Sequence, residues 1–210
     1  MENVLVAGAT GTTGRKIVDL LNHSSEYKPI ALVRKLEQIA EFEKQGIETR
    51  LGDLEDNIED IAKGINKVIF AAGSGGKKVY EIDQEGAKKL MDASKKADVS
   101  KFVMLSSMGA DNPEAVSDLK DYMMAKHNAD QYLKASLLPY SIIRPGALTN
   151  DAGTGEIKAA STLGNPGSIS RDDVAKALVA SLPNDIGRDT SFEIVSGDTT
   201  IEEAVKNITI

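Results

Sequence analysis

The sequence of 210 residues contains no cysteine and no tryptophan, and only two histidines, His23 and His127. Disulfide bonds, thiolate metal sites and thiol nucleophiles are therefore excluded. We also expect no metal centre, because two histidines are too few for a His-rich site. Aromatic residues make up only 4% of the chain, which disfavours a base-stacking surface for single-stranded nucleic acid. The net charge of −7 disfavours nucleic acid further, because a phosphate backbone calls for a basic face.

Long apolar runs are also lacking. No stretch approaches the roughly 20 apolar residues of a membrane-spanning helix, and the opening Met1-Glu2-Asn3 does not form the basic start of a signal peptide. We therefore expect no membrane partner and a cytoplasmic location. The length and the ordinary shares of apolar and charged residues, 41% and 27%, predict one globular domain over residues 1–210.

Short β-branched and apolar runs alternate with segments of helical periodicity along the whole chain. This alternation predicts an α/β fold of the Rossmann type, a doubly wound parallel sheet with helices on both faces. The expected strands are residues 4–7, 29–33, 47–51, 67–72, 101–105, 140–143 and 191–195, and the expected helices are residues 13–21, 36–45, 81–97, 119–135, 172–182 and 201–206.

A less regular segment, residues 147–170, lies beyond the sixth expected strand. Most of it, residues 147–168, is rich in Gly, Ala, Ser, Thr and Asn. Ligands of doubly wound sheets bind at the carboxyl ends of the strands. We therefore predict that this small C-terminal segment walls a pocket for a small-molecule substrate. The alternative is an ordinary surface loop.

Three glycines, Gly8, Gly11 and Gly14, follow the first expected strand and open the first expected helix. This context is typical of a dinucleotide-binding loop. Gly8 would permit the tight turn, Gly11 the close approach of a pyrophosphate, and Gly14 the packing of the helix on the sheet. The free N–H groups at the helix start would bind the phosphates. The hydroxyl donors of the loop are Thr10, Thr12 and Thr13.

Glycine-rich loops of this kind have two other interpretations. A P-loop is excluded because no Gly-Lys-Ser/Thr follows at the required position. A glycine-rich turn without a ligand is the remaining alternative.

Arg34 lies about 20 positions after the last glycine, at the end of the second expected strand. A site for NAD(H) carries an acidic residue here, which binds the ribose 2′-hydroxyl. An arginine instead suits a 2′-phosphate, which it can bind through paired charge-assisted hydrogen bonds. Arg15, directly after the last glycine, could contribute a second guanidinium. We therefore expect NADP(H) rather than NAD(H). The alternative is a solvated Arg-Lys pair at the start of a helix.

Several short motifs resemble the atypical short-chain dehydrogenase/reductase superfamily, and more narrowly its small NAD(P)H-binding proteins related to the NmrA-like proteins and the biliverdin/flavin reductases. The motifs are Gly-Ala-Thr-Gly-Thr-Thr-Gly-Arg at 8–15, Val33-Arg34, Gly52-Asp53-Leu54, Lys-Phe-Val-Met-Leu-Ser-Ser at 101–107, and Ile143-Arg144-Pro145-Gly146.

The resemblance implies further cofactor contacts. They are Asp53 and Leu54 along the adenine, Ala71, Ala72 and Gly73 along the ribose and pyrophosphate, and Pro145 and Gly146 behind the nicotinamide. For Asp53 the alternative is an N-cap or turn residue. We expect Arg144 to form a structural salt bridge under the sheet.

Tyr122 and Lys126 stand four residues apart in an expected helix and so share one face. In the short-chain dehydrogenases that the chain resembles, a Ser, a Tyr and a Lys perform acid–base chemistry at the substrate oxygen. The resemblance therefore implies a catalytic set of Ser107, Tyr122 and Lys126, with Ser106 as the alternative serine. Lys126 would also bind the hydroxyls of the nicotinamide ribose. The alternative is chance spacing on an amphipathic helix.

These features predict an NADP(H)-dependent oxidoreductase that reduces a small carbonyl, quinone or flavin-like compound. One alternative is a non-catalytic NADP(H) sensor or assembly factor. The small size of the expected substrate segment favours this alternative. A sugar-nucleotide epimerase or dehydratase is disfavoured, because such proteins usually carry a large substrate domain for which this chain has no room.

Overall fold

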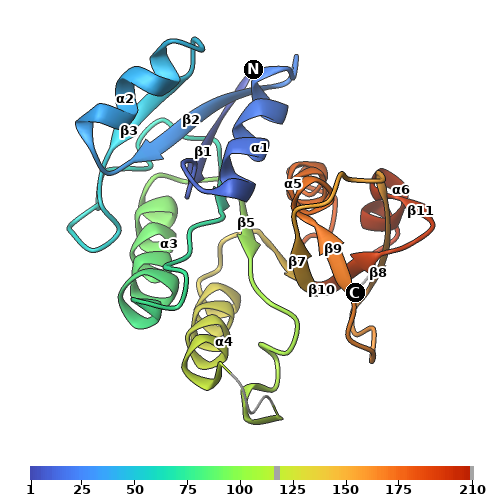
Figure 1. Cartoon of the computed structure of the whole chain (residues 1–210). Helices are drawn as coiled ribbons and strands as arrows, with labels where there is room; N and C mark the ends of the chain where they lie inside the picture. Colours follow the sequence, from blue (N-terminus) through green and yellow to red (C-terminus); the bar gives the residue numbers. More distant parts are fainter. Residues whose placement is uncertain (116–118, 209–210) are drawn as a thin grey trace.

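The structure is a computed structural model that describes residues 1–115 and 119–208 (Figure 1). In this part of the chain, nine strands form one sheet in the order β11-β8-β10-β6-β5-β4-β1-β2-β3. A separate small sheet pairs β7 (Ala147–Thr149) with β9 (Ser168–Ser170). The strands of the large sheet are β1 (Glu2–Ala7), β2 (Tyr27–Val33), β3 (Glu48–Leu51), β4 (Lys67–Phe70), β5 (Lys101–Leu105), β6 (Tyr140–Pro145), β8 (Glu156–Ala160), β10 (Thr190–Ser196) and β11 (Thr199–Thr200).

Helices cover both faces of this sheet. Side chains of α1, α2, α5 and α6 share one buried apolar cluster with the sheet, and side chains of α3 and α4 share the other. Among the described helices, none is both long and apolar enough to cross a bilayer. The helices are α1 (Thr12–Asn22), α2 (Leu36–Glu43), α3 (Ala87–Lys96), α4 (Lys120–Ala135), α5 (Arg171–Ala180) and α6 (Ile201–Lys206), with a π-helix η1 (Val79–Gly86) and a short 3₁₀ turn η2 (Pro113–Ala115).

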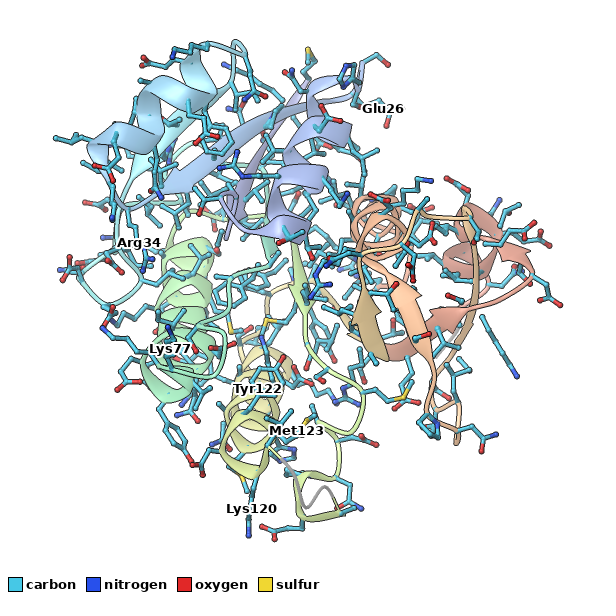
Figure 2. The ribbon with its side chains drawn as sticks, viewed as in Figure 1. Glu26, Arg34, Lys77, Lys120, Tyr122 and Met123 are labelled. Carbon is cyan, nitrogen blue, oxygen red and sulfur yellow. The ribbon has the colours of Figure 1, made fainter. Side chains whose placement is uncertain are left out.

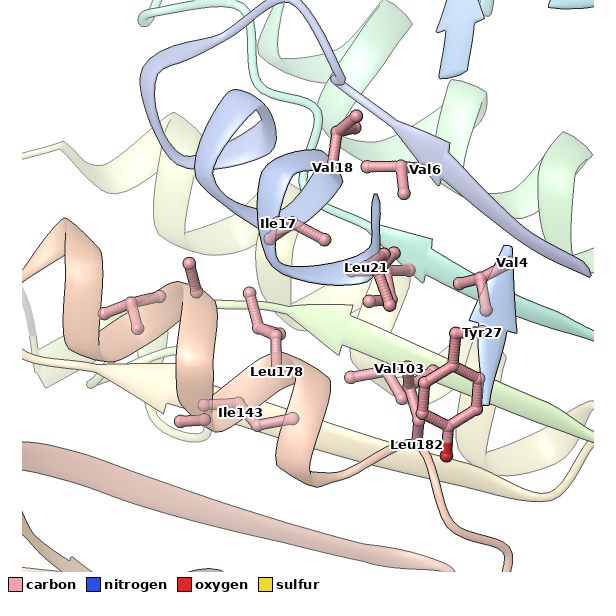
Figure 3. Packing of buried hydrophobic residues seen from close by; sticks show 14 of the residues in the cluster. Val4, Val6, Ile17, Val18, Leu21, Tyr27, Val103, Ile143, Leu178 and Leu182 are labelled. Atoms are coloured by element: carbon pink, nitrogen blue, oxygen red, sulfur yellow. The ribbon is translucent and has the colours of Figure 1, made fainter. Parts of the chain in front are cut away.

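The apolar run of β1 contributes buried side chains to both faces of the sheet. Val4 and Val6 pack with α1 and α5, as Figure 3 shows, whereas Leu5 and Ala7 belong to the cluster under α3 and α4. Successive side chains of a strand point to opposite faces, so a strand covered on both sides is apolar at every position. This is why the central strands are visible in the sequence as continuous apolar runs.

The predicted Rossmann-type α/β fold is confirmed, and a strand or helix occurs at each expected position. The sheet is parallel from β3 through β10. Beyond β10 the expectation of a parallel sheet is wrong, because β8 pairs antiparallel with both β10 and β11. β10 and β11 run in the same direction, separated by Gly197 and Asp198, and both pair with β8, which runs the opposite way.

The segment 147–170 is more regular than an ordinary surface loop, because it contains β7, β8 and β9. These strands are three to five residues long, too short to give a periodic pattern in the sequence. The turn before β8 is fixed by the buried carboxylate of Asp173, which accepts the N–H groups of Thr154 at 3.0 Å and Gly155 at 2.9 Å.

The helix expected at residues 81–97 begins with a π-helix. The wider turns of η1 run from Val79 to Gly86 and pass directly into α3. Such turns insert an extra residue and are frequent at functional sites. Here they place the side chain of Asp83 in the interior, where it is 1% exposed.

Two buried lysines, at the amino-terminal ends of β4 and β5, bind the loop between α5 and β10. Lys67, at the start of β4, donates to the carbonyl of Leu182 at 3.0 Å. Lys101, at the start of β5, is fully buried and donates to the carbonyl of Ile186 at 2.9 Å. Burial lowers the pKa of Lys101 to about 8.

Lys101 is therefore expected to make stability depend on pH. Between about pH 8 and 10.5 the unfolded chain binds more protons at this lysine than the folded chain does, so the free energy of unfolding rises with pH. In Lys101→Met this rise should be smaller by roughly 2 kcal/mol between about pH 7 and pH 10. Urea unfolding across this range measures it, with the exposed Lys95→Met as the control. Identical pH profiles for wild type and Lys101→Met would contradict the assignment.

Candidate functional site

The turn between β1 and α1 is formed by backbone groups in very close contact. Gly8 has a left-handed φ of +86°, and a Cβ atom on it would lie 2.6 Å from the peptide unit of Ala71 and Ala72. A Cβ atom on Gly14 would overlap the carbonyl oxygen of Gly8. The Gly11 N–H donates to the same oxygen at 2.9 Å. Only glycine fits at Gly8 and Gly14, so these two glycines bring β1, α1 and the end of β4 together.

The start of α1 faces this turn with free hydrogen-bond donors. Gly11 occupies the N-cap position in an extended conformation, and no side chain of the described residues caps the helix. The N–H groups of the first turn and the positive end of the helix dipole are thus available to an anion. Thr12 lies exposed at this position, whereas Thr13 is buried.

A pocket of about 380 Å³ opens beside this turn, at the carboxyl ends of β1, β2, β3 and β4. Strand order changes direction between β1 and β4, which is the position where doubly wound sheets bind ligands. The pocket brings together nine residues that sequence analysis assigned to the cofactor: Gly8, Thr10, Gly11, Arg34, Asp53, Leu54, Ala71, Ala72 and Gly73.

Six lining residues were missed by sequence analysis: Leu32, Gly52, Ser74, Lys77, Lys78 and Ile82. The sequence signal for the two lysines is the small-residue run Gly73-Ser74-Gly75-Gly76, which precedes them directly. Gly75 and Gly76 both have left-handed φ, +63° and +83°. They allow the chain to turn sharply after β4, so that Lys77 and Lys78 line the pocket.

Arg34 and Lys77 lie on the same side of the molecule (Figure 2). Arg34 is exposed directly after β2. Arg15, considered as a possible helper, does not line the pocket and forms an ion pair with Glu41 instead.

The remaining predicted residues lie outside this lining. Thr12, Thr13 and Gly14 belong to the first turn of α1, and Pro145 and Gly146 lie at the end of β6. Pro145 is buried, and the Gly146 N–H donates to the Ile194 carbonyl at 3.0 Å. Their roles toward a cofactor stay predictions.

Lys126 is held by a buried ion pair. Its Nζ lies 3.3 Å from Oδ1 of Asp83, and both side chains are almost fully buried. The other carboxylate oxygen of Asp83 accepts the N–H of Ser74 at 3.0 Å. Lys126 also donates to the carbonyl of Leu105, the last residue of β5, at 3.3 Å. The ion pair therefore joins α4, η1, the end of β5 and the loop that lines the pocket.

Tyr122 lies in the first turn of α4, beside Lys120 and Met123 (Figure 2), and is half-buried. The Nζ atom of Lys126 is 5.6 Å from the centre of its ring. Ser107 is half-buried just after β5, and its hydroxyl makes a long contact of 3.4 Å with the Met108 carbonyl. In the described part of the chain, no hydrogen bond joins Ser107 to Tyr122. The structure thus brings Tyr122 and Lys126 together and leaves Ser107 near the strand to which Lys126 bonds.

Ser106, the alternative serine, has a structural partner. Its hydroxyl donates to the buried carboxylate of Asp130 at 3.0 Å, and Arg144 donates to the same oxygen at 2.9 Å and 3.0 Å. Burial raises the pKa of Asp130, and Arg144 offsets part of that rise. Arg144 therefore forms the structural salt bridge expected from the sequence.

Fold and site together define a Rossmann protein with a dinucleotide-binding turn. A family model described as NAD(P)H-binding matches residues 8–185, and the chain belongs to this family. The membership confirms the resemblance to the NmrA-like, atypical short-chain dehydrogenase/reductase proteins. The family comprises oxidoreductase-like and epimerase-like proteins.

Three similar proteins illustrate this range. The chain is 43% identical to the Bacillus subtilis protein YhfK, described as an uncharacterized sugar epimerase, over 98% of this chain and 99% of YhfK. It is 28% identical to sanguinarine reductase of Eschscholzia californica, over 97% of this chain and 92% of the reductase. A solved structure from Bacillus halodurans, described as a candidate NAD-dependent epimerase/dehydratase, is 33% identical, with a TM-score of 0.93 over 99% of this chain and 100% of that chain.

The ion pair of Asp83 and Lys126 generates a stability prediction. Asp83→Asn keeps the shape but leaves the Lys126 ammonium buried without a carboxylate, which should lower the free energy of unfolding by about 3 kcal/mol. Adding Lys126→Met removes the unpaired charge and should restore part of the loss.

Urea unfolding of both variants measures these changes. Asp92→Asn, an exposed carboxylate that accepts a hydrogen bond from Tyr132, is the matched control and should change the free energy by less than about 1 kcal/mol. Equal, small losses in Asp83→Asn and Asp92→Asn would show that the buried pair contributes nothing special.

Proposed function

We propose that this protein is an NADP(H)-dependent reductase of a small carbonyl, quinone or flavin-like compound. The observation that carries the proposal is the position of Lys126, which is fixed by Asp83 to the same loop that lines the dinucleotide pocket. This arrangement would place an ammonium and the neighbouring Tyr122 at the nicotinamide end of a dinucleotide whose phosphates lie on α1.

The pocket residues suit the phosphorylated dinucleotide. Arg34 lies where a carboxylate would stand in a site for NAD(H), and its guanidinium can bind a 2′-phosphate through paired hydrogen bonds. Leu54 and Leu32 offer apolar surface to the adenine. The uncapped N–H groups of α1 suit the pyrophosphate.

The chemistry at the substrate would then need one acid. When bound, the reduced nicotinamide supplies the hydride. Tyr122 would donate its phenol proton to the substrate oxygen, and its half-exposed position allows it to regain a proton from solvent. Ser107 would donate a hydrogen bond to the same oxygen, and Lys126 would orient the ribose and the phenol. The segment 147–170 would close the substrate pocket opposite α4.

The description of YhfK as a sugar epimerase favours a second candidate, an epimerase or dehydratase that uses the same tyrosine and lysine. Such an enzyme returns its hydride within the reaction and consumes no NADPH overall. Net NADPH oxidation in the presence of carbonyls, quinones or flavins therefore separates the two candidates.

Tyr122→Phe tests the proposed acid. The loss of the phenol should reduce NADPH oxidation with an active acceptor by about 100-fold or more, because general acid catalysis contributes this much. NADPH affinity should stay within about twofold of wild type, because the phenol touches the substrate rather than the phosphates. NADPH fluorescence follows both quantities.

Tyr132→Phe is the matched control on the same helix. Tyr132 is exposed and bonds to Asp92 at 2.8 Å, so its loss should leave turnover unchanged. Full turnover in Tyr122→Phe would eliminate Tyr122 as the acid.

A further inference from the structure

Four charged side chains line the dinucleotide pocket: Arg34, Asp53, Lys77 and Lys78. They follow the ends of three different strands and line the same pocket. Asp53 follows β3, Arg34 follows β2, and the two lysines follow β4. The ligand that this pocket prefers depends on which of these charged side chains have no ion-pair partner in the protein.

Lys78 is already paired. Its Nζ lies 2.6 Å and 2.9 Å from the two carboxylate oxygens of Glu55, and this contact raises the pKa of Lys78. The neighbouring cation Lys35 pairs with Glu37 at 3.4 Å and does not line the pocket. Arg34 and Lys77 have no ion pair with any residue of the described ranges. Two unpaired cations therefore face one pocket.

We infer that Lys77 is a second ligand of the 2′-phosphate, opposite Arg34, and so a determinant of cofactor specificity. The inference rests on the proposed use of NADP(H). A phosphomonoester carries a charge between −1 and −2 near neutral pH and has three acceptor oxygens, so one guanidinium does not satisfy it. Arg34 would bind two oxygens in its plane, and the flexible ammonium of Lys77 would reach a third from the loop after β4.

The placement of Lys77 depends on the two glycines before it. Gly75 and Gly76 have left-handed φ, and a Cβ atom at either would meet nothing within 4 Å. Glycine is therefore favoured at these positions by the left-handed backbone conformation and not by a lack of space for a side chain. They turn the loop so that Lys77 lines the same pocket as Arg34, although Arg34 follows β2, which lies two strands away from β4 in the sheet.

Direct binding measurements test the inference. The dissociation constants of NADPH and NADH, and of adenosine 2′,5′-bisphosphate and AMP, are measured by titration calorimetry for wild type, Lys77→Ala, Lys77→Arg and Lys35→Ala. In Lys77→Ala the affinity for NADPH and for the bisphosphate should fall about tenfold, as for the loss of one charge-assisted hydrogen bond. The affinities for NADH and AMP should change less than about twofold.

The two control variants distinguish direct contact of Lys77 with the phosphate from a general effect of positive charge near the pocket. Lys35→Ala removes a neighbouring cation outside the pocket and should leave all four affinities within about twofold of wild type. Lys77→Arg keeps a donor and should restore most of the preference for NADPH. Lys77 is exposed, so equal unfolding midpoints are expected for all variants.

The following results would overturn the inference. If Lys77→Ala weakens NADPH and NADH equally, or weakens neither, Lys77 does not bind the 2′-phosphate. A wild-type protein that prefers NADH, or binds neither dinucleotide, would overturn the proposed cofactor as well. A wild-type protein that prefers NADPH but oxidises none with any acceptor would overturn only the proposed reaction.

Discussion

The backbone contact among β1, α1 and the end of β4 is the constraint on which the rest of the site depends. Gly14 packs against the carbonyl of Gly8, and Gly8 packs against the peptide of Ala71 and Ala72, with no space for a side chain at either glycine. Overpacking of a well-packed region costs typically ~1–3 kcal/mol, and occasionally more. The contact points the start of α1 across the carboxyl ends of the strands, so helix N–H groups and strand ends face the same pocket.

A second constraint extends this junction toward α4. Asp83, turned inward by the π-helix, binds the loop after β4 with one oxygen and Lys126 with the other. A buried ion pair gains little net stability over an apolar pair, but its loss on one side is costly. Such a pair serves to fix geometry, and here it ties the position of Lys126 to the loop that carries Ser74 and Lys77. One carboxylate therefore contacts both Lys126 and the loop that lines the pocket.

Sequence reasoning reached what is encoded locally. Gly8 and Arg34 follow directly on a strand, and Gly11 and Asp53 lie within four residues of a strand end; strand ends are visible as the ends of apolar runs. Their meeting in one pocket then follows from the parallel order of the sheet. Lys77 and Asp83 escaped this reasoning because their positions depend on a turn made by two glycines and on a π-helix, which a helical or loop pattern does not reveal.

The antiparallel strand β8 at the edge of the sheet was not predicted from the sequence for a related reason. Strands β7, β8 and β9 are short, and among their residues only Ile157 of β8 and Ile169 of β9 are buried completely. β8 pairs with β10, about 30 residues further along the chain, and Asp173 binds the turn before it, so its position depends on distant residues rather than on its own composition.

The central claim is that the crevice at the ends of β1 and β4 binds NADP(H). Thermal unfolding of the wild-type protein with NADPH or NADH at equal concentration tests it most directly. A ligand that binds only the folded state stabilises it by about 2.7 kcal/mol at one hundred times its dissociation constant. The account predicts a clear rise of the unfolding temperature with NADPH and a smaller one with NADH. A larger rise with NADH, or none with either dinucleotide, would contradict it.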